Sequence, residues 1–457
     1  MQRIPVEKFE LPQFDDDDVI KSWKWLMSFI SENDWRKRKA IIEDKIAVEF
    51  RTSKPFSESL TEGTLVVIKD DIIGWYLYLV DMLIHEPHKY EYFQGARIIP
   101  VFKRLGIDLD TLKNIDGIEI RVKDLLKKRK SEADALLFEI LTALLWAKNG
   151  YQVAFLAEKN GEKTPDIIAE RGGRAWNIEC KRQSKTSDYT YKETAKRQRM
   201  VSFISKVLLE RNMLLDIVFH VELETLPDTF LRDLLEHKLK LAISGKIISS
   251  DQVDIDLAFV NIPVIKEHLQ NYSVKHSSPK LNELIGNKRL DNKGFTCGIY
   301  ANFFRVGEGE VNNLYISDIT NAYGIYWTCD AKEALWAKAR NIKSQLHKAM
   351  QQFNSKDTAI IHVGMETFDG PEVEKTRFDK IAQTIEKIDP NKTNLRWIFC
   401  HFFQAYSLPD QYWVFDETVS AISSYLQPKS PLDIKLMIVS DDGDTADDVS
   451  HWDRPMP

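Results

Sequence analysis

Three charged residues near the middle of the chain have the types and spacing that hydrolysis of a phosphodiester requires. Asp166 starts one strand-like run, PDIIAER, and Glu179 and Lys181 lie in the next, RAWNIECKR. Between the runs, Gly172 and Gly173 tolerate positive φ and predict a two-residue primed turn. In the register of so tight a hairpin Asp166 faces Glu179, and Lys181 lies on the same face because side chains alternate along a strand.

Two opposed carboxylates predict a bound cation. Their Cβ atoms would lie roughly 4.5–5.5 Å apart, where like charges repel. Mg²⁺ takes oxygen ligands, commonly one or two carboxylates with water and phosphate. Asp166 and Glu179 supply the carboxylates, and the carbonyl of Cys180 stays near the ion although its side chain points to the other face. Lys181 would hold the attacking water and offset phosphoryl charge. We therefore expect Mg²⁺ as cofactor, with Mn²⁺ as a substitute.

A fourth catalytic residue and metal ligand is expected from the helix that precedes the hairpin. Glu139 lies within the apolar run LLFEILTALL, where a buried carboxylate needs a partner or a shifted pKa. Glu132 lies seven residues earlier on nearly the same stripe and is the rival candidate. We favour Glu139 because it lies deeper in the apolar run.

Short strings of the same form occur elsewhere, so the string alone is weak support. Pro409-Asp410 followed by Asp433-Ile434-Lys435 is such a decoy, but an expected helix, ETVSAISSYL, separates its two parts. Only the set around Lys181 combines strand context, turn residues, opposed register and an upstream helical glutamate. The alternative for that set is a cross-strand ion cluster on the surface, balanced by arginines.

The chain divides by pattern into four parts. Residues 1–125 predict a mainly helical region, 126–265 the domain that holds the hairpin, 266–440 a C-terminal α/β region, and 441–457 an acidic, mobile tail.

The expected elements are a capped helix from Ser131 to Asn149-Gly150, a strand at 151–158, the hairpin, a helix at about 189–210 and a strand at 214–224. Further on, helices are expected near 229–243 and at about 332–353, and strands near 255–263, at 358–365 and at 394–403.

The set resembles the PD-(D/E)XK nuclease superfamily, which has the restriction-endonuclease-like fold. The resemblance rests on Glu139, Pro165-Asp166 and Glu179-Cys180-Lys181. It covers residues 131–224, in the order αβββαβ, and it implies an α/β fold class. It also implies that Asp166 and Glu179 bind metal, that Glu139 is an auxiliary ligand and that Lys181 positions the water.

The helix after Lys181 predicts a surface for nucleic acid. Lys192, Lys196 and Arg199 fall on one helical face, and Tyr191 could stack on a base. For each residue alone a solvated basic face is an equally good interpretation. Whether Gln198 or Arg197 reaches the active site stays open, because the register is not fixed.

Bulk composition agrees with a soluble globular protein and excludes some functions. The chain has 457 residues, 43% of them hydrophobic and 29% charged, a net charge of −6 and four scattered cysteines. We expect a cytoplasmic protein without a membrane span, a P-loop or a zinc motif.

The resulting hypothesis is a Mg²⁺-dependent nuclease, most simply an endonuclease on DNA that serves bacterial defence against foreign DNA. The alternatives are a catalytically silent nucleic-acid-binding or scaffold module and an RNA-directed nuclease. A homo-oligomer or a partner protein is left open.

Overall fold

The computed structural model describes most of the chain. The described residues are 2–9, 14–52, 68–157, 164–183, 187–241, 243–288, 294–339, 341–353, 358–366, 369–388, 394–423, 429–439 and 449–453.

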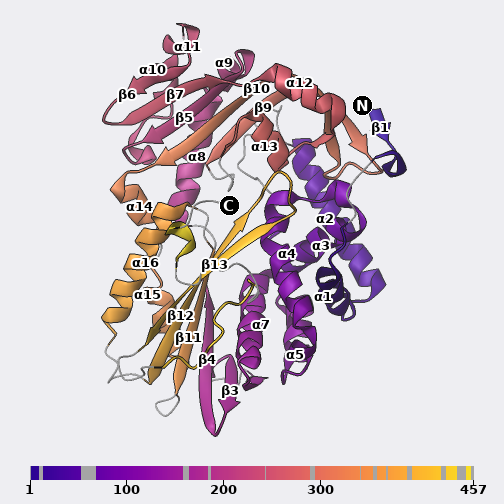
Figure 1. Ribbon diagram of the computed structural model, residues 1–457, viewed down its shortest axis with the longest axis vertical. Coiled ribbons are helices and arrows are strands. Elements are labelled where there is room, and N and C mark those ends of the chain that lie inside the picture. Colours follow the sequence, from indigo (N-terminus) through magenta and orange to yellow (C-terminus); the bar gives the residue numbers. More distant parts are fainter. Residues whose placement is uncertain are drawn as a thin grey trace.

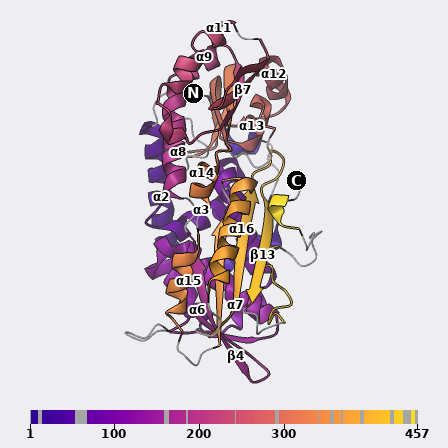
Figure 2. The same cartoon turned by 90° about the vertical axis from the view of Figure 1, so that its left-hand side faces the viewer.

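Two mixed β-sheets lie one above the other along the long axis of the molecule (Figures 1 and 2), so the chain belongs to the α/β class. The lower sheet has the order β13 (Val414–Ser423), β12 (Leu395–Tyr406), β11 (Ala359–Glu366), β4 (Arg174–Arg182), β3 (Ile167–Arg171) and β2 (Gln152–Phe155). The upper sheet has the order β1 (Gln2–Ile4), β9 (Phe295–Val306), β10 (Leu314–Cys329), β5 (Met213–Phe219), β7 (Val253–Phe259) and β6 (Gly245–Ser249), with β8 (Val274–Lys275) beside β10.

The helices gather into three groups. The N-terminal group is α1 (Asp17–Met27), α2 (Glu32–Thr52), α3 (Ile72–His85), α4 (Tyr92–Ile107), α5 (Leu109–Lys113), α6 (Ile118–Lys123) and α7 (Ala133–Lys148). The upper group is α8 (Asp188–Ser202), α9 (Ser205–Glu210), α10 (Phe230–Leu235), α11 (Lys238–Leu241), α12 (Ile262–Asn271) and α13 (Pro279–Ile285). The last group is α14 (Lys332–Lys338), α15 (Lys343–Met350) and α16 (Pro371–Glu386). Among the described residues, no helix has both the length and the apolar character needed to cross a bilayer.

The tight hairpin and its register are confirmed. Arg171 pairs with Arg174 and Ile167 with Ile178, so the turn between β3 and β4 has two residues. Both turn residues have positive φ, 59° at Gly172 and 74° at Gly173. A side chain at either position would meet open space, so it is the backbone conformation of the primed turn that requires glycine.

The strand expected to complete this sheet was predicted wrongly. The strand expected at 214–224 forms β5, which lies in the upper sheet between β10 and β7. The neighbour of β4 is instead β11, in parallel register, with Cys180 opposite His362. The two strands differ in burial: β11 is buried at nearly every residue, whereas β5 alternates. A central parallel strand is covered on both faces, so a continuous apolar run is what its position requires.

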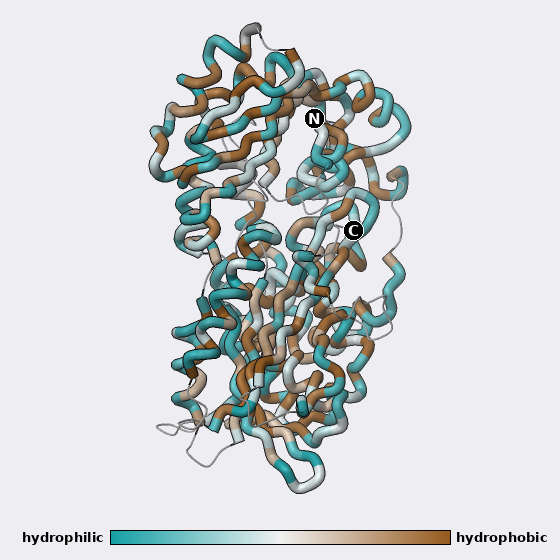
Figure 3. The backbone as a smooth tube through the Cα atoms, turned by 60° about the vertical axis from the view of Figure 1, so that its left-hand side comes forward, coloured by the Kyte–Doolittle hydropathy of each residue, from teal (hydrophilic) through white to brown (hydrophobic). Residues whose placement is uncertain are grey.

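Helices cover both faces of the lower sheet (Figure 1). Trp176, Ile178 and Cys180 of β4 belong to the same hydrophobic core as α7, and Ile361 and Val363 of β11 belong to a core with α15 and α16. In Figure 2, α15 and α16 stand in front of the sheet. Helix α8 leads from the lower sheet to the upper sheet (Figure 1). In the upper sheet, hydrophobic and hydrophilic residues alternate along the strands, as Figure 3 shows.

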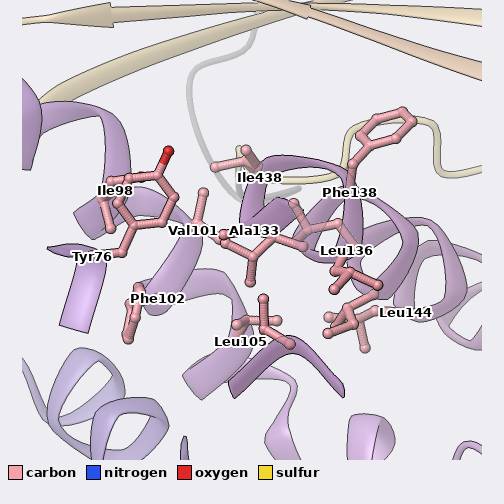
Figure 4. Packing of buried hydrophobic residues seen from close by; sticks show 14 of the residues in the cluster. Tyr76, Ile98, Val101, Phe102, Leu105, Ala133, Leu136, Phe138, Leu144 and Ile438 are labelled. Carbon is pink, nitrogen blue, oxygen red and sulfur yellow. The ribbon is translucent and has the colours of Figure 1, made fainter. Parts of the chain in front are cut away.

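The N-terminal helices and α7 share one hydrophobic core with the lower sheet (Figure 4). Nearly every residue of α3 is buried, as its apolar sequence predicts. Tyr76, Phe102 and Leu136 from three helices meet near Ile438 of the C-terminal segment. The predicted helical region is therefore packed against the sheet that holds the hairpin.

Several local predictions were wrong in detail. Ser131 forms no capping box: α7 begins at Ala133 after a short 3₁₀ turn, and the side chain of its N-cap residue, Glu132, makes no capping hydrogen bond to the helix. Each expected long helix is observed as two helices: α8 and α9, α10 and α11, and α14 and α15. The expected helix ETVSAISSYL is largely β13, because pairing with β12 satisfies its backbone. Of the tail expected to be mobile, residues 449–453 are described, and His451 packs there against Thr418; the rest lies outside the described residues.

A buried lysine lies where the upper sheet meets the N-terminal helices. Lys275 of β8 is 4% exposed, and its ammonium donates to the carbonyl of Tyr90. The ring of Tyr92 lies 5.8 Å from Nζ. Burial lowers the pKa of Lys275 to about 7, against the opposing attraction of Glu91. The contact between the upper sheet and the N-terminal helices therefore contains a lysine that titrates near neutral pH.

Lys275→Met should change how stability depends on pH. The unfolded chain binds a proton at this lysine up to about pH 10.5, and the folded protein only up to about pH 7. Stability therefore rises with pH between these values. From pH 7 to 9 the free energy of unfolding of the wild type should rise by about 2 kcal/mol more than that of Lys275→Met. Urea titrations at both pH values test this, and parallel changes in the two proteins would refute it.

Candidate active site

The candidate site lies where β3 and β4 separate. Their ladder ends at the pair Ile167–Ile178, so Asp166 is the first residue beyond it. The Asp166 carboxylate accepts a hydrogen bond of 2.8 Å from the backbone N–H of Cys180. In a strand, the N–H and C=O of one residue point to the same side. The Cys180 carbonyl therefore lies on the same edge of β4 as its N–H, the edge that Asp166 adjoins.

Alternation along the strands puts the three predicted residues on one face. Ile167, Ile178 and Cys180 belong to the core beneath α7. Asp166, Glu179 and Lys181 are their chain neighbours and so face the other side of the sheet. The hairpin thus brings these three together as the register predicts.

Glu179 is the most perturbed group of the site. The residue is 2% exposed, and one carboxylate oxygen, Oε1, binds the Lys181 ammonium. The other, Oε2, is buried and has no hydrogen-bond partner among the described residues. Burial raises the pKa of Glu179 to about 8, and the charges of Asp166 and, more weakly, Glu139 add to this effect. An orphaned carboxylate oxygen is the feature that a bound cation would satisfy.

Lys181 is held as a cation beside these acids. Burial alone would lower the pKa of Lys181, but the carboxylate of Glu179 outweighs it, so the pKa lies above the ordinary value. Its side chain is 25% exposed, whereas that of Glu179 is 3% exposed. The ammonium therefore reaches from the buried acid toward solvent.

The thiol of Cys180 is not a nucleophile in this environment. Burial raises its pKa well above the ordinary value, and the charges of Asp166 and Glu139 add to the effect. A thiol kept protonated reacts poorly, because the thiolate is the reactive form.

The structure pairs Glu139 with a residue that the sequence analysis missed. Glu139 is buried on α7, and its Oε2 lies 3.0 Å from Nη1 of Arg121 on α6. The rival candidate, Glu132, is exposed on its side chain and pairs with Arg129. Arg121 lies in the basic run RVKDLLKKRK, and its spacing from Glu139 gives no sign of a contact between them.

The residues present fit a divalent cation only with help from the backbone and solvent. Among the described residues there is no group of three or more His, Cys, Asp or Glu side chains that could hold a metal ion. Asp166 and Glu179 give two carboxylates, and Cys180 gives a carbonyl. This hard oxygen set suits Mg²⁺, which commonly keeps several waters and binds substrate phosphate.

The predicted nucleic-acid residues of α8 fall into two kinds. Tyr191 is 65% exposed, and Lys192 is also exposed. Lys196 is 8% exposed, and its ammonium lies 2.7 Å from Asp228. Arg199 is exposed but donates to the same carboxylate at 3.0 Å. Lys196 and Arg199 therefore share an acidic partner on the same surface, which reduces the positive charge that they present.

The two residues left open on α8 also have distinct positions. Arg197 donates to the Thr194 hydroxyl at 3.1 Å, and Gln198 is exposed.

Comparison with protein-family models, with curated proteins and with solved structures finds no match for this chain.

Proposed function

We propose that this chain is a Mg²⁺-dependent nuclease that hydrolyses phosphodiester bonds, with DNA as the favoured substrate. The observation that carries the proposal is the buried, orphaned carboxylate oxygen of Glu179, beside Lys181 and on the same face as Asp166. Opposed acids with a neighbouring ammonium are the parts that metal-assisted hydrolysis needs.

The order of elements around the site supports the same proposal. Along the chain, a helix (α7) and an antiparallel meander (β2, β3, β4) of the lower part are followed by α8, which packs with the upper sheet, and much later by β11, which is parallel to β4. We take this order as a variant of the αβββαβ order of the restriction-endonuclease-like fold, in which β11 would be the final strand. Residues 205–358, which include most of the upper sheet, would then be an insertion between the helix and that strand.

Each residue of the site has a proposed role. Asp166, Glu179 and the Cys180 carbonyl would hold Mg²⁺, which when bound supplies a Lewis acid and an activated water. Lys181 would orient the attacking water and stabilise negative charge on the phosphoryl oxygens. The hydrogen bond from Cys180 N–H fixes the orientation of the Asp166 carboxylate, so one ligand is already positioned.

A substrate panel tests this function. Purified protein should cleave DNA in the presence of Mg²⁺ or Mn²⁺ and should not cleave it in EDTA, with linear, circular and single-stranded DNA and RNA compared in parallel. Cleavage of RNA alone would identify the RNA-directed alternative. Binding without cleavage in both metals would identify a catalytically silent module and refute the nuclease.

Lys192→Ala and Lys196→Ala should differ in their effects. The exposed ammonium of Lys192 is available to phosphate, so its loss should weaken DNA binding and reduce the slope of log K against log salt by about 1. Lys196 is buried against Asp228, so its loss should lower the melting temperature and leave that slope nearly unchanged. Fluorescence-anisotropy titrations at several salt concentrations measure the slopes. Equal slopes for the wild type and Lys192→Ala would show that α8 is not part of the DNA-binding surface.

A further inference from the structure

A buried ion pair joins the N-terminal helices to α7 close to the candidate site. Nη1 of Arg121 lies 3.0 Å from Oε2 of Glu139, and their side chains are 8% and 7% exposed. The Arg121 guanidinium also lies over the ring of Phe155, 5.2 Å from its centroid, at the end of β2. Removal of one partner of a buried pair leaves the charge of the other uncompensated.

Glu139 lies on one face of the lower sheet, whereas Asp166 and Glu179 lie on the other face. It lies on α7, three residues before Thr142, whose hydroxyl bonds the Cys180 thiol on the face of β4 that α7 covers. Glu179 points to the other face. Glu139 is near enough to raise the pKa of Glu179, but its influence is weaker than those of burial and Asp166.

The charges around Glu139 explain the role of Arg121. The charges of Asp166 and Glu139 both act on Glu179, and all three acids act on the thiol of Cys180. Lys181 binds Glu179, and Arg121 binds Glu139. Arginine keeps its charge at any pH at which proteins are folded, so it is a permanent cation at the third acid. A second divalent ion at Glu139 would have to displace it.

We propose that Arg121 is a positioning residue that occupies Glu139 and restricts the site to one divalent cation, held by Asp166 and Glu179. This inference rests on the proposed function, because it takes the metal site for granted. It replaces the expectation that Glu139 is an auxiliary ligand. The N-terminal helices thereby contribute directly to the composition of the site, through α6.

Mn²⁺ binding to the full chain, followed by electron paramagnetic resonance of the free ion, tests the proposal without any activity assay. The wild type should bind one Mn²⁺ per chain. Glu139→Gln should also bind one, with a Kd within about threefold of the wild type, whereas loss of a ligand should weaken binding by about tenfold or more. The double variant Arg121→Gln/Glu139→Gln removes both charges together, so it keeps the buried pair neutral, and it should match Glu139→Gln.

The outcomes separate this inference from the proposed function. Two Mn²⁺ per wild-type chain, or tenfold weaker binding in both Glu139→Gln and the double variant, would overturn the role of Arg121 and leave the nuclease standing. No Mn²⁺ binding, or binding that Glu179→Gln does not weaken, would overturn the metal site and this inference with it. One Mn²⁺ that depends on Glu179 and not on Glu139 supports both.

Discussion

Glu179→Gln should abolish Mg²⁺-dependent cleavage while the protein stays folded. The variant keeps the size of the side chain but removes the charge that would bind the cation. Several kcal/mol of transition-state stabilisation should be lost, which corresponds to a rate at least about 10³-fold lower. Because the carboxyl group is buried and its pKa is raised, a neutral amide suits the position when no metal is bound. Single-turnover cleavage and thermal unfolding measure the two effects.

The matched control for this variant lies in the same hairpin. Glu170 of β3 is exposed, so Glu170→Gln makes the same chemical change away from the candidate site and should cleave at the wild-type rate. Asp166→Asn and Lys181→Ala should lose Mg²⁺-dependent cleavage, as Glu179→Gln does. Cleavage by all three at wild-type rates would end the nuclease proposal.

Glu417→Gln should be the most destabilising conservative change in the lower sheet. Glu417 lies on β13 and is 3% exposed. Its carboxylate accepts hydrogen bonds from the backbone N–H groups of Met437 at 2.9 Å, Ile438 at 2.9 Å and Val439 at 3.3 Å. An amide would turn its own N–H groups toward these donors. Hydrogen bonds to a buried charge are strong, so we expect a loss of about 3 kcal/mol in the free energy of unfolding.

The same carboxylate also ends a chain of buried rings. Trp146 donates to His362 at 3.1 Å, His362 lies 2.9 Å from His401, and His401 lies 3.5 Å from Glu417. Both histidines are fully buried. Burial lowers the pKa of His362 well below the ordinary value. Loss of Glu417 would therefore disturb the sheet as well as residues 437–439.

Urea unfolding and amide hydrogen exchange measure this effect together. The amides of residues 437–439 should exchange faster in Glu417→Gln than in the wild type. Glu386→Gln, at the exposed end of α16, is the control and should change stability by no more than about 0.5 kcal/mol. A Glu417→Gln protein as stable as this control would show that the buried carboxylate is not an anchor.

Local sequence determined the hairpin and the three residues of its functional face. The two glycines permit positive φ at both turn positions, and alternation then fixes which side chains share a face with Asp166. A local contact also fixes the start of α1, where the N-cap Asp16 accepts a hydrogen bond from the N–H of Val19. Such features depend on contacts within a few residues, which the sequence displays directly.

Local reasoning failed where a long-range contact decides the conformation. The run ETVSAISSYL has no strong signal against a helix, yet it forms most of β13, because β12 offers it a ladder. The capping signal at Ser131 was overruled by the short 3₁₀ turn that leads into α7. Propensity is a weak prior that tertiary packing overrides.

The sequence by itself determined that Asp166, Glu179 and Lys181 lie together, since two strands and a two-residue turn leave only one register. Only the tertiary structure decided that β11, not β5, lies beside β4, and that Arg121 forms an ion pair with Glu139. These partners are separated from the hairpin by long stretches of chain. Their contacts depend on how the sheets and helices pack, and no local pattern encodes that packing.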